Sequence, residues 1–189
     1  MNADLLVYQA KAFYNAYIAL DQLSRDDSDT LLLLFAPLVV NGAFSVELAL
    51  KAILAKNQIE YGKEHNLLIL FQMLPKSFQQ ELWAYLIEKA PEYAGSEKGL
   101  DELILLSNAF VDWRYAFEGK PVPAIESRFL AAFANAAVHT MFSYYNADLL
   151  PATKAESNNE IEQRFHENRE KCKEINLKMI QKNTKEHQL

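Results

Sequence analysis

The side chains best suited to chemistry are concentrated in one short segment, Ser107–Glu118, which combines Asn, Asp, Trp, Arg, Tyr and Glu residues. Within it, Arg114 lies between Trp113 and Tyr115. An arginine flanked by aromatic rings can stack on them while its planar guanidinium still offers donors to a phosphate group. The segment therefore suits contact with RNA or with a nucleotide.

A structural role for the same segment remains open. Trp113 and Phe117 have the character of core residues, and Arg114 could be held by Glu118, one helical turn away, or by Glu47. The candidate ligand-binding residues are Glu47, Lys51, Asn108, Asp112, Trp113, Arg114, Tyr115, Glu118 and Lys120.

Glu47 and Lys51 are also one helical turn apart, with the acid on the N-terminal side. On a helix surface, such a pair contributes about 0.2–0.5 kcal/mol. A polar pair inside a cleft is the functional alternative. The spacing alone favours the surface ion pair.

The four histidines and the single cysteine do not have metal-ligand spacing, so we expect neither a metal nor another cofactor. His139 falls in an apolar stretch, where a histidine is more often a core residue, although it could approach Arg114 in space. His65 precedes a short apolar run, and we expect it to order the start of the helix there.

Three motifs together resemble the HEPN family: Glu-Leu-Ala-Leu-Lys-Ala at 47–52, His-Asn-Leu at 65–67 and Trp-Arg-Tyr-Ala-Phe-Glu at 113–118. The resemblance implies a helical bundle of a kind found in many prokaryotic toxin–antitoxin and phage-defence systems. It also implies a homodimer, since active members are often dimers that share a composite site. These active members are metal-independent ribonucleases, in which an arginine is followed after four to six residues by a histidine.

The chain departs from that ribonuclease motif, because Gly119, Lys120 and Pro121 occupy the positions where the histidine would follow Arg114. A ribonuclease of this sequence would need a substitute acid or base. The catalytic residues are therefore unassigned, and the candidates are Arg114, Glu118 and His139.

Apolar residues recur at three- and four-residue steps along most of the chain, which predicts an all-α antiparallel bundle of about five to seven helices. Pro37 should kink the second helix or place its true start near Ala36. The last bundle helix is apolar on nearly all sides and should be central. The predicted helices span residues 4–23, 31–57, 65–74, 76–90, 100–118 and 124–149.

The composition changes after Pro151, so we predict a bundle over residues 1–150 and a charged amphipathic C-terminal helix over residues 151–189. The tail has an apolar stripe with coiled-coil-like spacing, formed by Ile161, Phe165, Cys172, Ile175 and Met179. Such a short stripe favours packing on the chain's own bundle, and a dimerisation arm is the alternative.

The 189 residues are 50% apolar and carry a net charge of −6, so no overall basic field draws in nucleic acid. The lone Cys172 allows no intramolecular disulfide and fits a reducing compartment. The N-terminus lacks a signal-peptide pattern, and the apolar run at 31–40 is short for a membrane span. We expect a soluble cytoplasmic protein that does not contact a membrane.

Three hypotheses for function follow. The first is a HEPN-like module, non-catalytic or non-standard, that binds RNA, a nucleotide or a protein partner in a defence or stress system. The second is a ribonuclease toxin that uses Arg114, and the third is a helical scaffold that assembles through its C-terminal helix. An open cleft around Glu47, Lys51, Arg114 and Glu118 would favour the first two, and a closed ion-pair network would favour the third.

Overall fold

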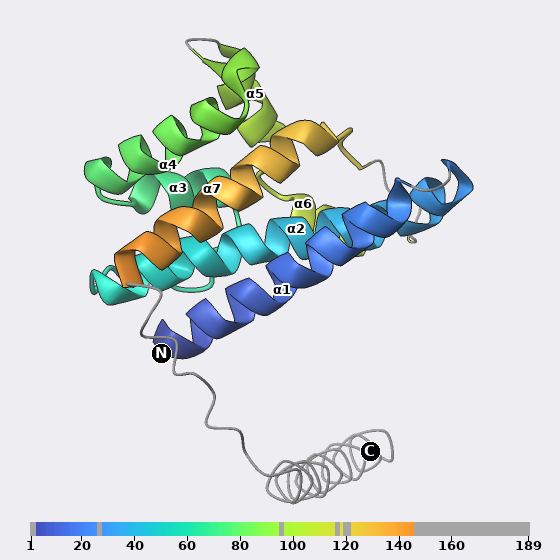
Figure 1. Cartoon of the computed structure of the whole chain (residues 1–189). Helices are drawn as coiled ribbons and strands as arrows, with labels where there is room; N and C mark the ends of the chain where they lie inside the picture. Colours follow the sequence, from blue (N-terminus) through green and yellow to red (C-terminus); the bar gives the residue numbers. More distant parts are fainter. Residues whose placement is uncertain (1–2, 26–27, 95–96, 116–117, 119–121, 146–189) are drawn as a thin grey trace, which may run out of the picture. The chain divides into compact units, whose positions relative to one another are not determined.

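The protein was analysed as a computed structural model, which describes residues 3–25, 28–94, 97–115, 118 and 122–145 (Figure 1). All of them lie within one compact unit, residues 1–149. The predicted C-terminal helix over 151–189 and its apolar stripe lie outside the described residues, as does Lys120.

The described part of the chain is all-α, as predicted, and forms seven α-helices and one 3-10 turn without a strand. The helices are α1 (Ala3–Ser24), α2 (Ser28–Lys56), α3 (Leu67–Met73), α4 (Lys76–Lys89), α5 (Glu97–Leu106), α6 (Ala109–Arg114) and α7 (Ser127–Tyr145), and the turn η1 (Pro91–Tyr93) lies between α4 and α5.

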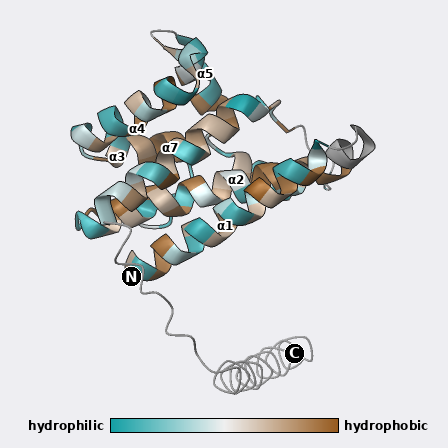
Figure 2. Cartoon of the chain, viewed as in Figure 1, coloured by the Kyte–Doolittle hydropathy of each residue, from teal (hydrophilic) through white to brown (hydrophobic). Residues whose placement is uncertain are grey.

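The core is built around α2 and α7. Helix α1 runs beside α2, and α7 lies against both α2 and α4 (Figure 1). Strongly hydrophobic stretches are visible on α2 (Figure 2), and α7 buries ten of its side chains, including Phe129, Phe133 and Met141. The prediction of a central, largely apolar last helix is therefore confirmed.

Helix α2 begins at Ser28 and continues through Pro37, so the alternative start near Ala36 is wrong. Proline lacks the amide hydrogen that would bond to the preceding turn. The carbonyl of Pro37 is itself capped, because Asn41 Nδ2 donates to it at 2.7 Å. Extensive burial of the rest of α2 stabilises a helix that carries this interruption.

Among the described helices, the segment Leu33–Lys56 of α2, which extends beyond the apolar run at 31–40, is long and apolar enough to cross a membrane by length and composition alone. In the bundle, 56% of its most apolar window is buried. This burial is typical of the core helix of a globular bundle.

The predicted helix over residues 100–118 is wrong, because the chain forms two helices, α5 and α6, that are separated at Ser107 and Asn108. The carbonyl of Ser107 accepts a hydrogen bond from the amide of Leu67 at 2.8 Å instead of continuing the helical ladder. A tertiary contact with the start of α3 thus interrupts a continuous helical pattern. This break sets the direction of α6, which carries Arg114.

Candidate functional site

Arg114 ends α6 and lies exposed on two aromatic rings. Its guanidinium carbon is 4.9 Å from the ring centroid of Phe110 and 4.6 Å from that of Tyr115. Its Nη2 atom donates a hydrogen bond to the Tyr115 hydroxyl at 2.9 Å. Aromatic contact of this kind orients a guanidinium without removing its charge from solvent.

Phe110 connects Arg114 to the interior of the bundle. Its ring is 9% exposed and stacks on Phe44 of α2, with ring centroids 4.3 Å apart. Phe44 in turn meets Phe13 of α1 edge to face at 4.6 Å. The surface beneath Arg114 is therefore anchored in the contact between α1 and α2.

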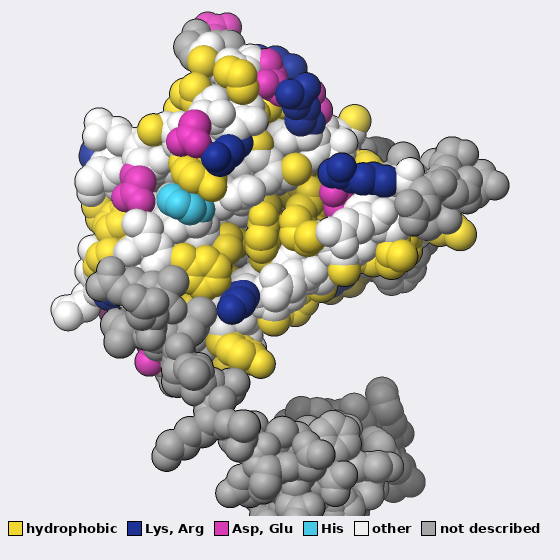
Figure 3. Space-filling model, in the orientation of Figure 1, with side chains coloured by type: hydrophobic (Ala, Val, Ile, Leu, Met, Phe, Trp, Pro, Cys, Tyr) yellow, Lys and Arg dark blue, Asp and Glu magenta, His cyan; other side chains and the backbone are white. Residues whose placement is uncertain are grey.

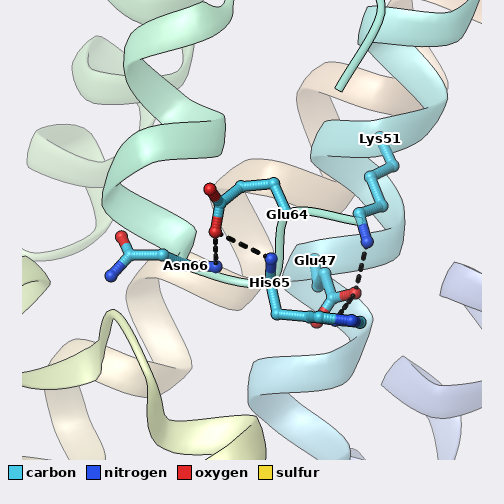
Figure 4. Close-up of polar contacts among 5 residues, drawn as sticks. All are labelled: Glu47, Lys51, Glu64, His65 and Asn66. Carbon is cyan, nitrogen blue, oxygen red and sulfur yellow. Dashed lines mark hydrogen bonds and ion pairs between the residues drawn. The ribbon is translucent and has the colours of Figure 1, made fainter. Parts of the chain in front are cut away.

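Glu47 and Lys51 form a buried ion pair, so the predicted surface pair is wrong. Their side chains are 2% and 9% exposed, and Lys51 Nζ lies 2.7 Å from Glu47 Oε1. The same oxygen is 2.9 Å from His65 Nδ1 (Figure 4). The i,i+4 spacing was correct, but neighbouring elements cover this face of α2 and remove the pair from solvent.

The ring of Tyr61 lies beside the ion pair of Glu47 and Lys51. Lys51 Nζ lies 5.4 Å from the centroid of its ring. Burial, and to a smaller extent the charge of Glu47, raises the pKa of the Tyr61 hydroxyl. The carboxylate of Glu47 is therefore surrounded by a lysine, a histidine and a neutral phenol.

A second carboxylate holds the backbone around His65. Glu64 Oε1 accepts hydrogen bonds from the amides of His65 at 2.9 Å and Asn66 at 2.7 Å (Figure 4). Asn66, rather than His65, caps α3, because its side-chain oxygen accepts from the Ile69 amide at 3.0 Å. The expectation that the His65 side chain orders the helix start is therefore wrong, because Asn66 has that role. The His65 side chain contacts Glu47 instead.

The loop that carries His65 is joined to the α5–α6 break. Asn66 Nδ2 donates to Asn108 Oδ1 at 3.0 Å, next to the backbone bond between Leu67 and Ser107. Asn108, a predicted site residue, therefore positions the loop. Through this junction the chain brings His65 to within 6.3 Å of Phe110, measured between ring centroids.

His65 and Arg114 consequently contact the same aromatic ring. We call the group Glu47, Lys51, His65, Phe110 and Arg114 the Arg114–His65 site. His65 was not among the predicted ligand-binding residues, because its neighbour Glu47 is eighteen positions away along the chain. The signal that could have identified it is the His-Asn-Leu motif at 65–67, which is one of the three motifs that resemble the HEPN family.

His139, a predicted catalytic candidate, lies elsewhere in the bundle. It is exposed on α7, which corrects the expectation of a core histidine. Its ring stacks on Tyr85 of α4, with centroids 3.8 Å apart. Arg114, in contrast, lies on the rings of Phe110, within α6, and Tyr115, just after it.

The other candidates have separate roles. Trp113 is partly buried and meets Phe35 edge to face at 5.1 Å, and its Nε1 has no acceptor among the described atoms. Asp112 is partly buried, and its amide donates to the Asn108 carbonyl at 2.9 Å within α6. Glu118 is exposed, and its amide donates to the Tyr115 carbonyl at 2.9 Å.

An open groove of about 580 Å³ lies among α3, α4 and α5. Its walls are largely apolar and include Phe71, Trp83, Ile87 and Leu103. None of the candidate residues lines this groove. Within the described ranges, no three His, Cys, Asp or Glu side chains are grouped so that they could hold a metal ion.

The chain was also compared with known protein families. The family model of the HEPN domain matches residues 38–128. Over these residues the chain is similar to the HEPN domain. The HEPN segment starts within α2, ends in α7 and contains the whole Arg114–His65 site. No curated protein and no solved structure matches the chain.

Proposed function

We propose that this HEPN-like protein binds a phosphate-bearing ligand, RNA or a nucleotide, through Arg114. The observation that carries the proposal is the exposed guanidinium over the rings of Phe110 and Tyr115. A guanidinium held in this way presents a planar set of donors that matches phosphate oxygens. Many HEPN proteins belong to toxin–antitoxin and phage-defence systems, so the proposal includes a role in defence or stress.

The charge distribution supports a local site. The chain has a net charge of −6, and acidic and basic side chains lie close together on the face shown in Figure 3. Lys51 is buried against Glu47, so its charge is largely balanced within the protein. Arg114 is the cation of the Arg114–His65 site that is exposed to solvent.

The test is binding of labelled single-stranded RNA and of labelled nucleotides to the full-length protein with Arg114→Ala. We expect the dissociation constant to rise at least about tenfold, as for an arginine at the centre of an interface. Arg114→Lys should restore only part of the affinity, because lysine keeps the charge but not the planar donors.

Arg25→Ala is the matched control, because Arg25 is exposed and pairs with Asp21 on α1. It should bind as the unaltered protein does. An Arg114→Ala protein with unaltered circular dichroism and unaltered affinity for every ligand would contradict the proposal.

A metal-independent ribonuclease is the second candidate, and one observation favours it. The Arg114–His65 site contains a histidine whose Nδ1 contacts a carboxylate, an arrangement suited to proton transfer. His65, rather than the predicted Glu118 or His139, would then be the substitute acid or base. In the presence of a chelator, the purified protein should cleave RNA, and both Arg114→Ala and His65→Ala should abolish cleavage. Intact RNA after incubation with the unaltered protein would contradict this second function.

A further inference from the structure

We propose that the open groove among α3, α4 and α5 is the docking site for the chain's own C-terminal tail. In this proposal the tail binds as an amphipathic helix, with Ile161, Phe165 and Cys172 against the apolar walls. The inference goes beyond the proposed phosphate contact at Arg114 and does not depend on it. It assigns an occupant to a groove that none of the candidate site residues lines.

The groove is an apolar surface that is open to solvent. Leu100 of α5, which lines it, is 48% exposed. Helix α3, which contributes Phe71, contains no charged residue. Exposed apolar surface that is gathered in one depression is typical of a site where another apolar element binds.

The last described helix ends beside this groove. Tyr144, in the last turn of α7, packs edge to face on Phe78 of α4, with ring centroids 4.6 Å apart. Phe78 lies in the chain between Lys76 and Gln79, which both line the groove. Residues 146–160 connect this point to the apolar stripe, and an extended chain of that length spans up to about 50 Å. The tail is therefore long enough to enter the groove at the start of α4.

The spacing of the stripe fits the length of the groove. Lys76 and Ile87 are the first and last groove residues on α4, and their separation corresponds to about 17 Å along a helix. Ile161 and Cys172 have the same separation in the sequence, with Phe165 one turn after Ile161. Apolar residues at three- and four-residue steps share one face of a helix, which is how a helix binds in a groove between other helices.

The charges around the groove differ between its ends. Lys76 lines the groove where α4 begins. Trp83, two turns further along α4, approaches α5 at Gly99, where an added Cβ atom would lie 2.9 Å from its ring. Next along α5, Asp101 and Glu102 lie in sequence between the two groove leucines of that helix. The groove is therefore basic at the start of α4 and acidic along α5.

The tail has the complementary order of charges. Residues 160–170 contain four acidic residues and two arginines, whereas residues 171–189 contain five lysines and two acidic residues. A tail that enters beside Lys76 brings its acidic half to this lysine and its basic half to the acidic residues of α5. Complementary charges of this kind fix the direction and register of a bound helix. Because the tail is tethered, it also binds at a high effective concentration.

The experiment uses Cys172, the only cysteine of the chain, in the full-length protein. Ala84→Cys, and separately Ile87→Cys, adds a second thiol in the groove, and copper–phenanthroline oxidises neighbouring thiols to a disulfide. Ala19→Cys is the matched control, because Ala19 is an exposed alanine on α1, which does not line the groove. Non-reducing electrophoresis and mass spectrometry distinguish a disulfide within one chain from a disulfide between two chains.

We expect a disulfide within one chain to form at least about tenfold faster with Ala84→Cys or Ile87→Cys than with Ala19→Cys, because docking brings the thiols within bonding distance. In the faster background, Phe165→Glu should lower the rate to that of the control, because it places a charge against apolar walls. Gln163→Glu, which adds the same charge on the opposite face of the tail helix, should leave the rate unchanged.

Three results would overturn the inference. The first is that neither groove cysteine reacts faster than the control, and the second is that Phe165→Glu and Gln163→Glu have the same effect. The third is a disulfide that joins two chains, which would make the tail of a second copy the occupant. The phosphate contact at Arg114 is tested by separate variants and is not affected by any of these outcomes.

Discussion

At the scale of single residues, burial raises the free-energy cost of removing either member of the Glu47–Lys51 pair. Two exposed charges at this spacing interact weakly because water screens them. Glu47 and Lys51 are almost completely withdrawn from water, and Glu47 also contacts His65. Removing one partner of a buried pair leaves the other charge uncompensated, which is more costly than losing the attraction itself.

We therefore expect Glu47→Ala to lower the free energy of unfolding by about 3–5 kcal/mol. Chemical denaturation followed by circular dichroism measures this change. Asp21→Ala is the control, because Asp21 forms an i,i+4 pair with Arg25 on the surface of α1. That substitution should cost no more than about 1 kcal/mol. Equal losses in the two variants would show that the burial of Glu47 and Lys51 has no energetic effect.

Tyr145 allows a pH-dependent prediction at the same scale. Its hydroxyl donates to the Ala52 carbonyl at 2.9 Å, and burial, assisted by the charge of Asp4, raises the pKa of Tyr145 to about 12. The unfolded tyrosine has a pKa of about 10. The folded state thus favours the neutral phenol, and this contribution to stability is fully present below about pH 10 and is lost as the pH rises through about 12.

Tyr145→Phe should reduce the free energy of unfolding by about 1 kcal/mol at neutral pH, because the hydrogen bond to Ala52 is lost. The difference between the two proteins should shrink as the pH approaches 11, since only the tyrosine ionises. Urea denaturation of both proteins at neutral pH and near pH 11 provides the measurement. A difference that does not change with pH would contradict the assignment.

At the scale of elements, small residues determine how closely the helices approach. A Cβ atom added at Gly42 of α2 would lie 3.0 Å from Tyr17 on α1 and 3.1 Å from Leu130 on α7. Real Cβ atoms rarely make such close contacts, so the side chain of Tyr17 or Leu130 would have to move by a few tenths of an ångström. Gly42 therefore allows α1, α2 and α7 to meet at one point.

We predict that Gly42→Ala destabilises the bundle by about 1–3 kcal/mol through overpacking. This loss exceeds the gain of about 1 kcal/mol that alanine brings to a helix interior. Thermal or urea denaturation measures the net change. In a Leu130→Ala background, where space is available, the same substitution should cost less. A stabilised Gly42→Ala protein would mean that the three helices are free to separate.

Contacts between elements also determine where the chain breaks between α5 and α6. Local apolar periodicity predicts one helix over residues 100–118, and no proline or glycine interrupts it. The amide of Leu67, at the start of α3, bonds to the Ser107 carbonyl and ends α5 there. As a result, α6 carries Phe110 onto Phe44 and brings Arg114 to the same ring as His65.

At the scale of the whole molecule, the core and the HEPN segment lie within the first 149 residues. We therefore expect a chain that ends at residue 150 to unfold cooperatively with nearly the full helical signal of the bundle. Circular dichroism during thermal denaturation tests this expectation. A truncated chain without a cooperative transition would show that residues 151–189 are part of the folding unit.

The same truncation tests the scaffold hypothesis and the predicted homodimer. If the apolar stripe of the tail drives assembly, sedimentation should show fewer subunits for the truncated chain than for the full chain. If the tail packs on its own bundle, as its short stripe favours, the number of subunits should not change. The two proteins should be compared at several concentrations, because dimerisation depends on mass action.

Much of the fold could be predicted from local signals in the sequence. The apolar period predicted α1, α4 and the central position of α7, and the boundaries of α1 and α4 differ from the prediction by one residue at most. Helix formation and core-facing patterns are local properties, so a single sequence carries them. Arg114 and its aromatic neighbours could be proposed as a site for the same reason, since they are adjacent in the chain.

Only the tertiary structure decided which distant residues meet. Sequence spacing paired Glu47 with Lys51 but could not show that other elements cover the pair, and it did not join Glu47 to His65. It left His139 as a candidate partner of Arg114, whereas the fold stacks His139 on Tyr85. Burial, and contacts between residues far apart in the chain, depend on how whole helices pack, and a local pattern of residues does not contain that information.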